Sequence, residues 1–192
     1  MRFARAKCAV AAFIIFFAIA EFSGSVVAAA ANEYQIKAAF IYKFCLYIEW
    51  PTQAFADANA PLIVGVAGPV EMVKELREVT QGRNIAGHPL TVMPVGDADP
   101  GILHVLYVTT PVVPGARKLI ARVHGTPTLV ITETTDSPIA GSVINFTTQE
   151  NRVRFDIDLD AAAQQGLHMG AQLLQVARTV QAAQPAARGN AP

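Results

Sequence analysis

The chain has 192 residues, and its 15 Lys and Arg residues balance its 15 Asp and Glu residues, so the formal net charge is zero. This balance, with only 16% charged residues, argues against a nucleic-acid binder, which would carry a basic face. A hydrophobic share of 52% and a mean hydropathy of +0.33 exclude an intrinsically disordered chain and raise the question of a membrane segment.

The N-terminal residues have the layout of an export signal. Basic residues precede the apolar run Cys8–Ala20, which is too short to cross a hydrocarbon core about 30 Å thick, and a stretch of small residues follows. We expect residues 1–31 to be a signal peptide cleaved near Ala29–Ala31; the alternative is an uncleaved anchor helix. The exported domain then spans residues 32–183, and the Ala- and Pro-rich residues 184–192 form a disordered tail.

The segment Asn32–Trp50 predicts a helix that Pro51 ends. Apolar residues cover most of its circumference, so this helix is either buried on two sides or half exposed until a partner covers it. It carries Cys45, the only cysteine left once the signal is removed, which excludes a disulfide within the chain. We expect a buried, unreactive thiol there.

Short apolar strands then alternate with amphipathic helices. This alternation predicts a single α/β domain with a mixed, mostly parallel sheet and helices on both faces. In chain order we expect the strand Leu62–Ala67, the helix Pro69–Thr80, the strands Pro89–Val95 and Leu103–Thr109, the helix Pro114–His124 and the strand Thr128–Glu133.

The pattern changes in the C-terminal part, where we expect an antiparallel hairpin. Ser142–Thr147 and Arg152–Leu159 are joined by a short polar turn, and the second of these strands alternates apolar with charged residues. Asp160 is expected to cap a short helix that ends at Gly166. A last helix is expected over Met169–Gln181.

No catalytic or metal-binding motif stands out. The four histidines lack the paired spacing of a zinc site, and no nucleophile motif of acyl transfer occurs. Asp156, Asp158 and Asp160 have calcium-loop spacing but lack the glycine and the distal glutamate of an EF-hand, so we interpret them as strand-face carboxylates and a helix cap. We expect neither enzymatic activity nor a metal or cofactor.

The segment Gly65–Pro69 follows a strand and opens a helix, a setting in which backbone N–H groups can hold phosphate. It lacks the further glycine and the lysine of the phosphate-binding motifs, so a tight turn is the favoured interpretation. A small ligand would nevertheless bind at the carboxyl ends of the strands in such a fold. The candidate ligand-binding residues there are Gly65, Gly68, Thr109, Thr110 and Glu133.

The segment KAAFIYKFCLYIEWP (Lys37–Pro51) resembles the opening signature of the YfiR/HmsC-like family of periplasmic bacterial proteins. Gly87–Val95 and Leu103–Thr109 are similar to the middle strands of that family. The run Ser142–Arg178, with its I-N-F, R-V-R-F and L-L-x-x-A elements, resembles the C-terminal part.

This resemblance implies a regulatory role in the periplasm. The studied relatives restrain a diguanylate cyclase of the inner membrane by contacting its periplasmic sensor portion, which lowers cyclic di-GMP and biofilm formation, and they have no enzymatic activity. A well-studied relative carries paired cysteines, one of them at the place where this chain has Leu103. The disulfide-linked redox control expected of that relative is therefore not available within this chain.

Two hypotheses follow. In the first, the protein is a negative regulator that binds the periplasmic sensor portion of an inner-membrane signalling protein, a diguanylate cyclase or another sensor, through a few apolar anchors. A homodimer could use the same surfaces, and for Tyr47 and Trp50 a place in the core is the favoured interpretation. The candidate contact residues are Tyr42, Tyr47, Glu49, Trp50, Gln172, Gln175 and Arg178. In the second, the domain is a small-ligand sensor that feeds a two-component or transport system.

Overall fold

The structure is a computed structural model that describes residues 33–96, 101–109, 115–134, 137–150 and 152–182. The expected signal peptide, the expected C-terminal tail and Thr110 lie outside the described residues. An N-terminal helix (residues 33–47) opens the described chain. The other helices are the 3-10 turn η1 (Thr52–Ala54), α2 (Val70–Thr80), α3 (Ala116–Arg122), α4 (Leu159–Gln164) and α5 (Ala171–Val176).

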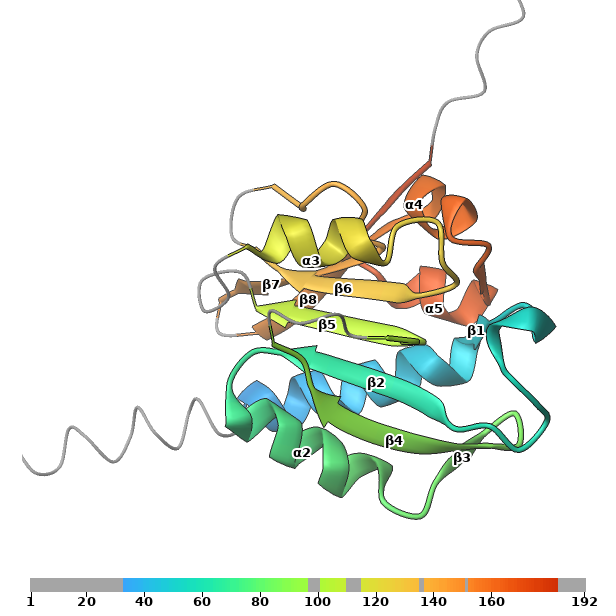
Figure 1. Ribbon diagram of the computed structural model, residues 1–192. Coiled ribbons are helices and arrows are strands. Elements are labelled where there is room, and N and C mark those ends of the chain that lie inside the picture. The colour runs from blue at the N-terminus through green and yellow to red at the C-terminus, as the bar shows by residue number, and fades with distance from the viewer. Residues whose placement is uncertain (1–32, 97–100, 110–114, 135–136, 151, 183–192) are drawn as a thin grey trace, which may run out of the picture.

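An eight-stranded sheet forms the centre of the molecule, in the order β10-β8-β7-β6-β5-β2-β4-β3 (Figure 1). The five strands from β4 to β7 are parallel, and β7 and β8 form an antiparallel hairpin. The predicted mixed, mostly parallel sheet with a C-terminal hairpin is therefore confirmed. The strands are β2 (Leu62–Ala67), β3 (Asn84–Ile85), β4 (His88–Pro94), β5 (Val105–Thr109), β6 (Leu129–Glu133), β7 (Ile144–Gln149), β8 (Arg152–Asp158) and β10 (Thr179–Gln181).

Helices cover both faces of the sheet, as predicted. The N-terminal helix and α2 lie on one face, where Phe44 packs between Phe146 and Phe155 with ring centroids 5.7 and 4.8 Å away. On the other face, Leu119 and Ile120 of α3 belong to a second apolar cluster with residues of β5 and β6. Because both of their faces are covered, β5 and β6 carry almost unbroken apolar runs instead of an alternating pattern.

The N-terminal helix ends earlier than predicted, at Tyr47. The next two residues, Ile48–Glu49 (β1), leave the helix and pair antiparallel with His168–Met169 (β9). This pairing supplies the backbone hydrogen bonds that a further helical turn would otherwise make, so the helix does not reach Trp50.

The C-terminal helices also differ from the prediction. Asp158, not Asp160, caps α4, because the Asp158 side chain accepts a hydrogen bond from the Ala161 N–H at 2.9 Å. The predicted helix over Met169–Gln181 is wrong in extent, since only Ala171–Val176 is helical. The chain then pairs with the free edge of β8 as β10, beginning with a hydrogen bond from the Arg178 N–H to the Phe155 carbonyl.

Gly65 lies in the middle of the sheet and offers a test of its packing. A Cβ atom there would lie 2.7 Å from Val95 Cγ2 and 2.9 Å from Leu103 Cδ1. Because both neighbours would have to move, we expect Gly65→Ala to lower the free energy of unfolding by about 2 kcal/mol. The matched control is Gly96→Ala, whose Cβ would meet no atom within 4 Å. Urea unfolding of both variants measures the difference, and equal stabilities would contradict the packing described here.

Candidate functional site

Two segments far apart in the sequence meet where the N-terminal helix ends. Next to the β1–β9 pairing, the Gly170 N–H donates a hydrogen bond to the Tyr47 carbonyl at 2.7 Å. A Cβ atom on Gly170 would lie 3.1 Å from that carbonyl oxygen, so the close approach favours glycine. The pairing brings the candidate residues Tyr47 and Glu49 beside the start of α5, which carries Gln172 and Gln175.

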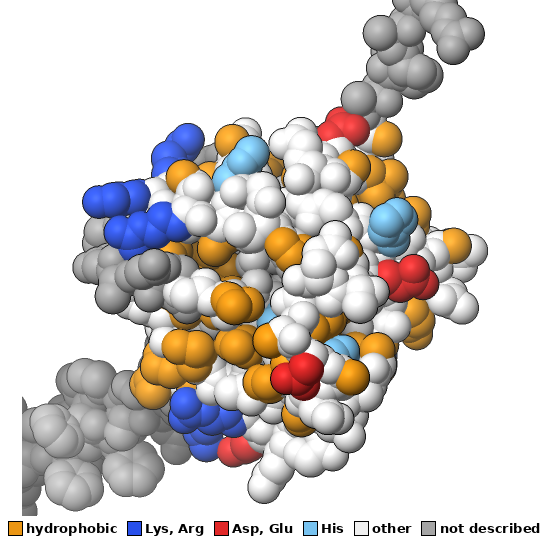
Figure 2. Space-filling model, turned by 45° about the vertical axis from the view of Figure 1, so that its right-hand side comes forward, with side chains coloured by type: hydrophobic (Ala, Val, Ile, Leu, Met, Phe, Trp, Pro, Cys, Tyr) orange, Lys and Arg blue, Asp and Glu red, His pale blue; other side chains and the backbone are white. Residues whose placement is uncertain are grey.

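Large apolar side chains are exposed around this pairing. We use the name β1–β9 surface for the exposed residues Leu46, Tyr47, Glu49, Gln172, Gln175 and Val176. Val176 is 65% exposed, Leu46 49% and Tyr47 38%. Figure 2 turns this side of the molecule forward and shows hydrophobic side chains together with separate Asp or Glu and His side chains, while Lys and Arg lie mainly at the left. A role of this surface in partner binding stays a prediction.

Tyr42 and Trp50 have contacts within the fold. The guanidinium of Arg83 lies over the Tyr42 ring, 4.6 Å from its centroid. The Trp50 indole Nε1 donates a hydrogen bond to the His104 carbonyl at 3.1 Å. Both side chains are half-buried, so these contacts explain why each ring is held in place. A role of either ring in partner binding stays a prediction.

Arg178 is engaged with a neighbouring strand. Its guanidinium forms a two-pronged ion pair with the Asp156 carboxylate, in which Nε donates at 2.8 Å. This pair ties the start of β10 to β8. A role of Arg178 in partner binding stays a prediction.

Of the candidate ligand residues, Gly68, Thr109 and Glu133 lie at the carboxyl edge of the sheet. The chain passes from β2 first to β4 on one side and then to β5 on the other, so the strand order reverses at β2 and β5. Such a reversal is where open α/β sheets usually bind ligands. Gly68 and Thr109 meet there, because a Cβ on Gly68 would lie 3.0 Å from Thr109 Oγ1. Gly65 is instead covered by side chains in mid-strand.

A buried lysine that sequence reasoning did not single out lies close to this edge. Lys37 is 2% exposed, and its ammonium contacts Glu33 Oε1 at 2.6 Å and Glu133 Oε1 at 2.7 Å. The Tyr107 hydroxyl donates to the second oxygen of Glu133 at 2.6 Å. Burial, together with the Glu133 carboxylate, raises the pKa of Tyr107, so this hydroxyl stays protonated and acts as a donor. We name these four residues the Lys37 cluster.

A sequence signal for this cluster exists. Lys37 interrupts an otherwise apolar helix, and a lysine is almost never fully buried unless it is paired. Its anionic partner Glu33 is one helical turn earlier, which the sequence makes visible. Glu133 comes from a strand nearly a hundred residues later, so only the fold reveals that contact.

A stack of three rings lies beneath the amino ends of the central strands. Phe55 is sandwiched between His88 and His104, with ring centroids 3.6 and 4.4 Å away. His104 Nδ1 accepts a hydrogen bond from the Ile63 N–H at 3.0 Å, so Nε2 carries the proton and donates to the Ala54 carbonyl at 3.1 Å. The buried, neutral imidazole therefore links η1 to β2 through one hydrogen bond to each.

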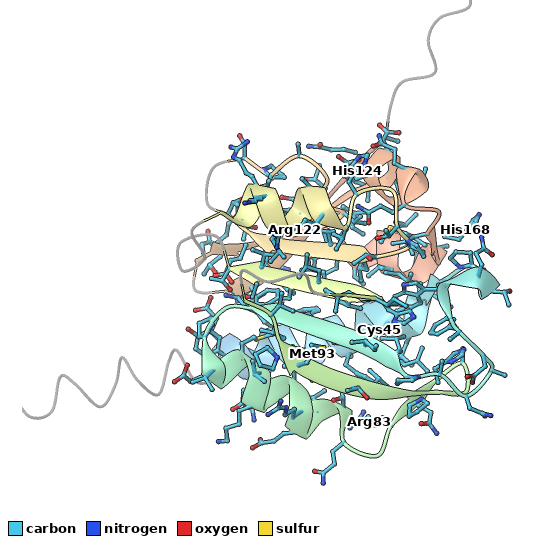
Figure 3. All side chains as sticks on the ribbon, in the orientation of Figure 1. Cys45, Arg83, Met93, Arg122, His124 and His168 are labelled. Atoms are coloured by element: carbon cyan, nitrogen blue, oxygen red, sulfur yellow. The ribbon has the colours of Figure 1, made fainter. Side chains whose placement is uncertain are left out.

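Cys45 is the free cysteine of the described residues. Cys45 lies inside the domain, as Figure 3 shows, and burial raises the pKa of its thiol to about 12. This agrees with the predicted unreactive thiol. Among the residues that the structure describes, no group of three or more His, Cys, Asp or Glu side chains could hold a metal ion.

Most of the chain matches a known protein family. The YfiR/HmsC-like family model matches residues 34–178, so the chain belongs to this family. The match begins inside the N-terminal helix and ends one residue before β10. It includes Lys37, Tyr107, Glu133 and both strands of the β1–β9 pairing, whereas Glu33 lies one residue before it. No curated protein matches the chain. None of the described helices combines the length and apolar character that crossing a bilayer requires.

The Lys37 cluster predicts a large effect of a single substitution. Lys37→Met leaves the Glu133 carboxylate, whose side chain is 27% exposed, without its cation. We expect a loss of about 3 kcal/mol in the free energy of unfolding. The control is Lys74→Met. The Lys74 side chain is 71% exposed and its Nζ lies 3.7 Å from Glu78 Oε1, so this ion pair should contribute less than about 0.5 kcal/mol to the free energy of unfolding. Adding Glu133→Gln to Lys37→Met should restore part of the loss, and similar losses in both single variants would contradict the assignment.

The ring stack predicts that stability falls in mild acid. Burial, with a smaller contribution from His88, lowers the pKa of His104 in the folded state, so the unfolded chain binds the proton more readily. The free energy of unfolding should therefore decrease as the pH falls below about 6.5, by at most about 1.4 kcal/mol per pH unit from this group. Urea unfolding between neutral and mildly acidic pH measures the slope. His104→Asn should reduce this slope, whereas His168→Asn, at an exposed position, should leave it unchanged. Equal slopes in the wild type and both variants would refute the assignment of the pH dependence to His104.

Proposed function

We propose that this member of the YfiR/HmsC-like family is a periplasmic negative regulator. It binds the periplasmic sensor portion of an inner-membrane signalling protein, a diguanylate cyclase, and so restrains the production of cyclic di-GMP and the formation of biofilm. The family match over residues 34–178 is the observation that carries this proposal. The proposal places the protein after export, with its signal peptide removed.

The β1–β9 surface supports a function through binding. Leu46, Tyr47 and Val176 expose apolar area that water must solvate in the free protein. Burying one such side chain completely stabilises a complex by roughly 1.5–3 kcal/mol before the costs of association. Glu49 and, on α5, Gln172 and Gln175 are exposed and would supply directional hydrogen bonds at the rim of the contact.

The same surface is held rigidly, which favours binding to a partner. Its two segments are fixed to each other by the β1–β9 pairing, and the inner faces of both helices are buried, with Phe44 and Leu173 in the main core. A surface that is already ordered loses little conformational entropy when the partner binds. Use of this surface for a homodimer is a competing outcome.

A small-ligand sensor is the alternative function. Its support is the meeting of Gly68 and Thr109 at the reversal of the strand order. Glu133, one of the candidate ligand residues, is committed elsewhere, since it binds Lys37 and accepts a hydrogen bond from the Tyr107 hydroxyl. We therefore prefer the regulator.

The test is a deletion strain complemented with variants. Deletion should raise the cellular level of cyclic di-GMP, measured by mass spectrometry, and the wild-type protein should restore it. Leu46→Asp should fail to restore it, because a carboxylate at the centre of the contact opposes desolvation. An unchanged level of cyclic di-GMP in the deletion strain would sink the proposal.

The matched control is Val70→Asp, which places the same carboxylate on a 73% exposed apolar position at the start of α2. Both substitutions are at exposed positions and should leave the melting temperature nearly unchanged. Val70→Asp should complement fully. Co-purification with a membrane cyclase should follow the same pattern and distinguishes loss of binding from loss of the protein.

A further inference from the structure

A groove between α3 and α4 lies apart from the β1–β9 surface. It has a volume of about 690 Å³, comparable with sites that hold drug-sized ligands, so it can hold a few residues of a peptide chain. One wall is α3, the other is formed by the end of β8 and the start of α4, and Ile139–Gly141 lie between the two walls. Figure 3 shows His124, which follows α3 and lines the groove, on the side of α3 that faces α4.

The described chain ends at the rim of this groove. β10 is the last strand and lies at the edge of the sheet, with Gln181 in register with Asp158 of β8. Asp158 lines the groove, and neighbouring strands are about 4.8 Å apart. Figure 1 shows β10 ending beside α4. The segment that follows, residues 183–192, therefore begins next to the groove.

The α4 wall of the groove carries a carboxylate without a partner. Asp160 is half-buried, and among the described residues its side chain has neither a hydrogen-bond partner nor an ion-pair partner. A partly buried charge is costly unless an opposite charge compensates it, so this wall favours a cationic side chain. Arg117 of the other wall lies in the first turn of α3, toward the carboxyl edge of the sheet, whereas Asp160 and the end of β10 lie at the amino edge. The chain thus arrives at the acidic end of the groove.

Residues 183–192 supply the matching charge. Their sequence is AQPAARGNAP, and Arg188 is the only charged residue in it. A guanidinium binds a carboxylate through two parallel hydrogen bonds, so Arg188 suits Asp160 as a partner. Most of the other residues are Ala, Gly or Pro, so the segment loses little side-chain entropy when it is bound.

The lining of the groove is already formed, and its side chains are also small. Gly141 and three alanines, Ala121, Ala140 and Ala161, belong to it. The Gln165 Nε2 donates a hydrogen bond to the Gly141 carbonyl at 3.0 Å, and Gly141 adopts φ +86°, which favours glycine. A peptide backbone can therefore approach this lining closely, and little rearrangement is needed.

The connection is long enough to bring the two charges together. Arg188 comes seven residues after Gln181, and a flexible segment of that length has a root-mean-square span of about 15 Å. Asp160 is two residues beyond Asp158, the register partner of Gln181. A short tether gives an effective concentration on the order of millimolar, so even a contact with a millimolar dissociation constant is occupied about half of the time.

We propose that residues 183–192 fold back into this groove and that the Arg188 guanidinium binds the Asp160 carboxylate. The bound segment covers the small side chains between α3 and α4 and closes the groove to other molecules. Composition alone predicts a disordered tail, because the sequence does not show that β10 ends beside an unpaired carboxylate. Position selects this segment over a separate ligand, since it is joined to the chain at the rim of the groove.

A spin label on the segment tests the contact in the full exported protein. Cys45 is buried and the pKa of its thiol is raised to about 12, so a nitroxide reagent modifies only the cysteine introduced by Asn190→Cys. The amide NMR signals of Ala121 and Ala140 should be broader in the labelled protein than in the same sample after reduction of the nitroxide. Equal signals before and after reduction would overturn the proposal.

Variants of the labelled protein separate binding from proximity. An exposed ion pair changes an equilibrium constant by up to about fivefold, which corresponds to a change in occupancy from about one half to about one sixth. Arg188→Gln and Asp160→Asn should therefore each reduce the broadening about threefold. The charge swap Asp160→Arg with Arg188→Asp should restore most of it. The matched control is Glu75→Gln, which removes a half-buried carboxylate of α2 outside the groove lining and should leave the broadening unchanged.

Two further results would contradict the proposal. Equal broadening in the wild type and in both single variants would mean that the label only diffuses near the groove. In a mixture of spin-labelled protein with ¹⁵N-labelled protein that carries no nitroxide, the ¹⁵N signals should stay sharp. Broadening of these signals would place the segment in the groove of a second copy and would overturn the contact within one chain.

Discussion

The buried ammonium of Lys37 constrains the arrangement of the whole molecule. A lysine that is 2% exposed must have its charge compensated, and two carboxylates do this at 2.6 and 2.7 Å. One of them, Glu133, ends the strand β6, so the ion pair locks the N-terminal helix to the carboxyl edge of the sheet. A slide or rotation of the helix by one residue would bury the charge without its partner. The apolar contacts of Phe44 with the hairpin favour burial of this helix, and the ion pair selects one position for it.

That position determines which side of the helix faces outward. With Lys37, Ile41 and Phe44 turned to the sheet, Leu46 and Tyr47 are exposed and Ile48 is directed into the pairing with β9. The exposed apolar residues are therefore a consequence of how the helix is anchored. A helix that is apolar over most of its circumference has to leave some of that surface outside, and here the outside lies beside α5, where a partner can cover it.

Local patterns predicted the elements that depend on local physics. The run Leu62–Ala67 became β2 with the same bounds, because an unbroken apolar run flanked by Pro61 and Gly68 has one stable place in a covered parallel sheet. The alternation in Arg152–Leu159 likewise predicted the hairpin correctly. The last helix was overestimated because apolar spacing continues past Val176, whereas the free edge of β8 and the Arg178–Asp156 ion pair stabilise a strand from Thr179.

The candidate site was less predictable, because it depends on contacts between segments that are far apart in the sequence. The helix pattern favoured the core for Tyr47, which is 38% exposed in the structure. The proximity of Tyr47 and Glu49 to α5 comes from a pairing between β1 and β9 that only the fold creates. The meeting of Gly68 with Thr109 followed from the general behaviour of strand ends, whereas the commitment of Glu133 to a lysine on the first helix did not.

The β1–β9 pairing and the Glu133–Lys37 ion pair both fix the position of the N-terminal helix. An enzyme or a sensor of this architecture would keep free polar groups at the carboxyl edge of the sheet. Here Glu133 and Tyr107 at this edge instead help to hold the N-terminal helix. Catalysis needs groups that are available to a substrate, while a regulator needs a rigid surface for its partner. Glu133 binds Lys37 and accepts a hydrogen bond from Tyr107, so both side chains help to fix the N-terminal helix, whose outer end lies beside α5. A fixed helix end is what the proposed role as a regulator requires, because an ordered surface loses little conformational entropy on binding.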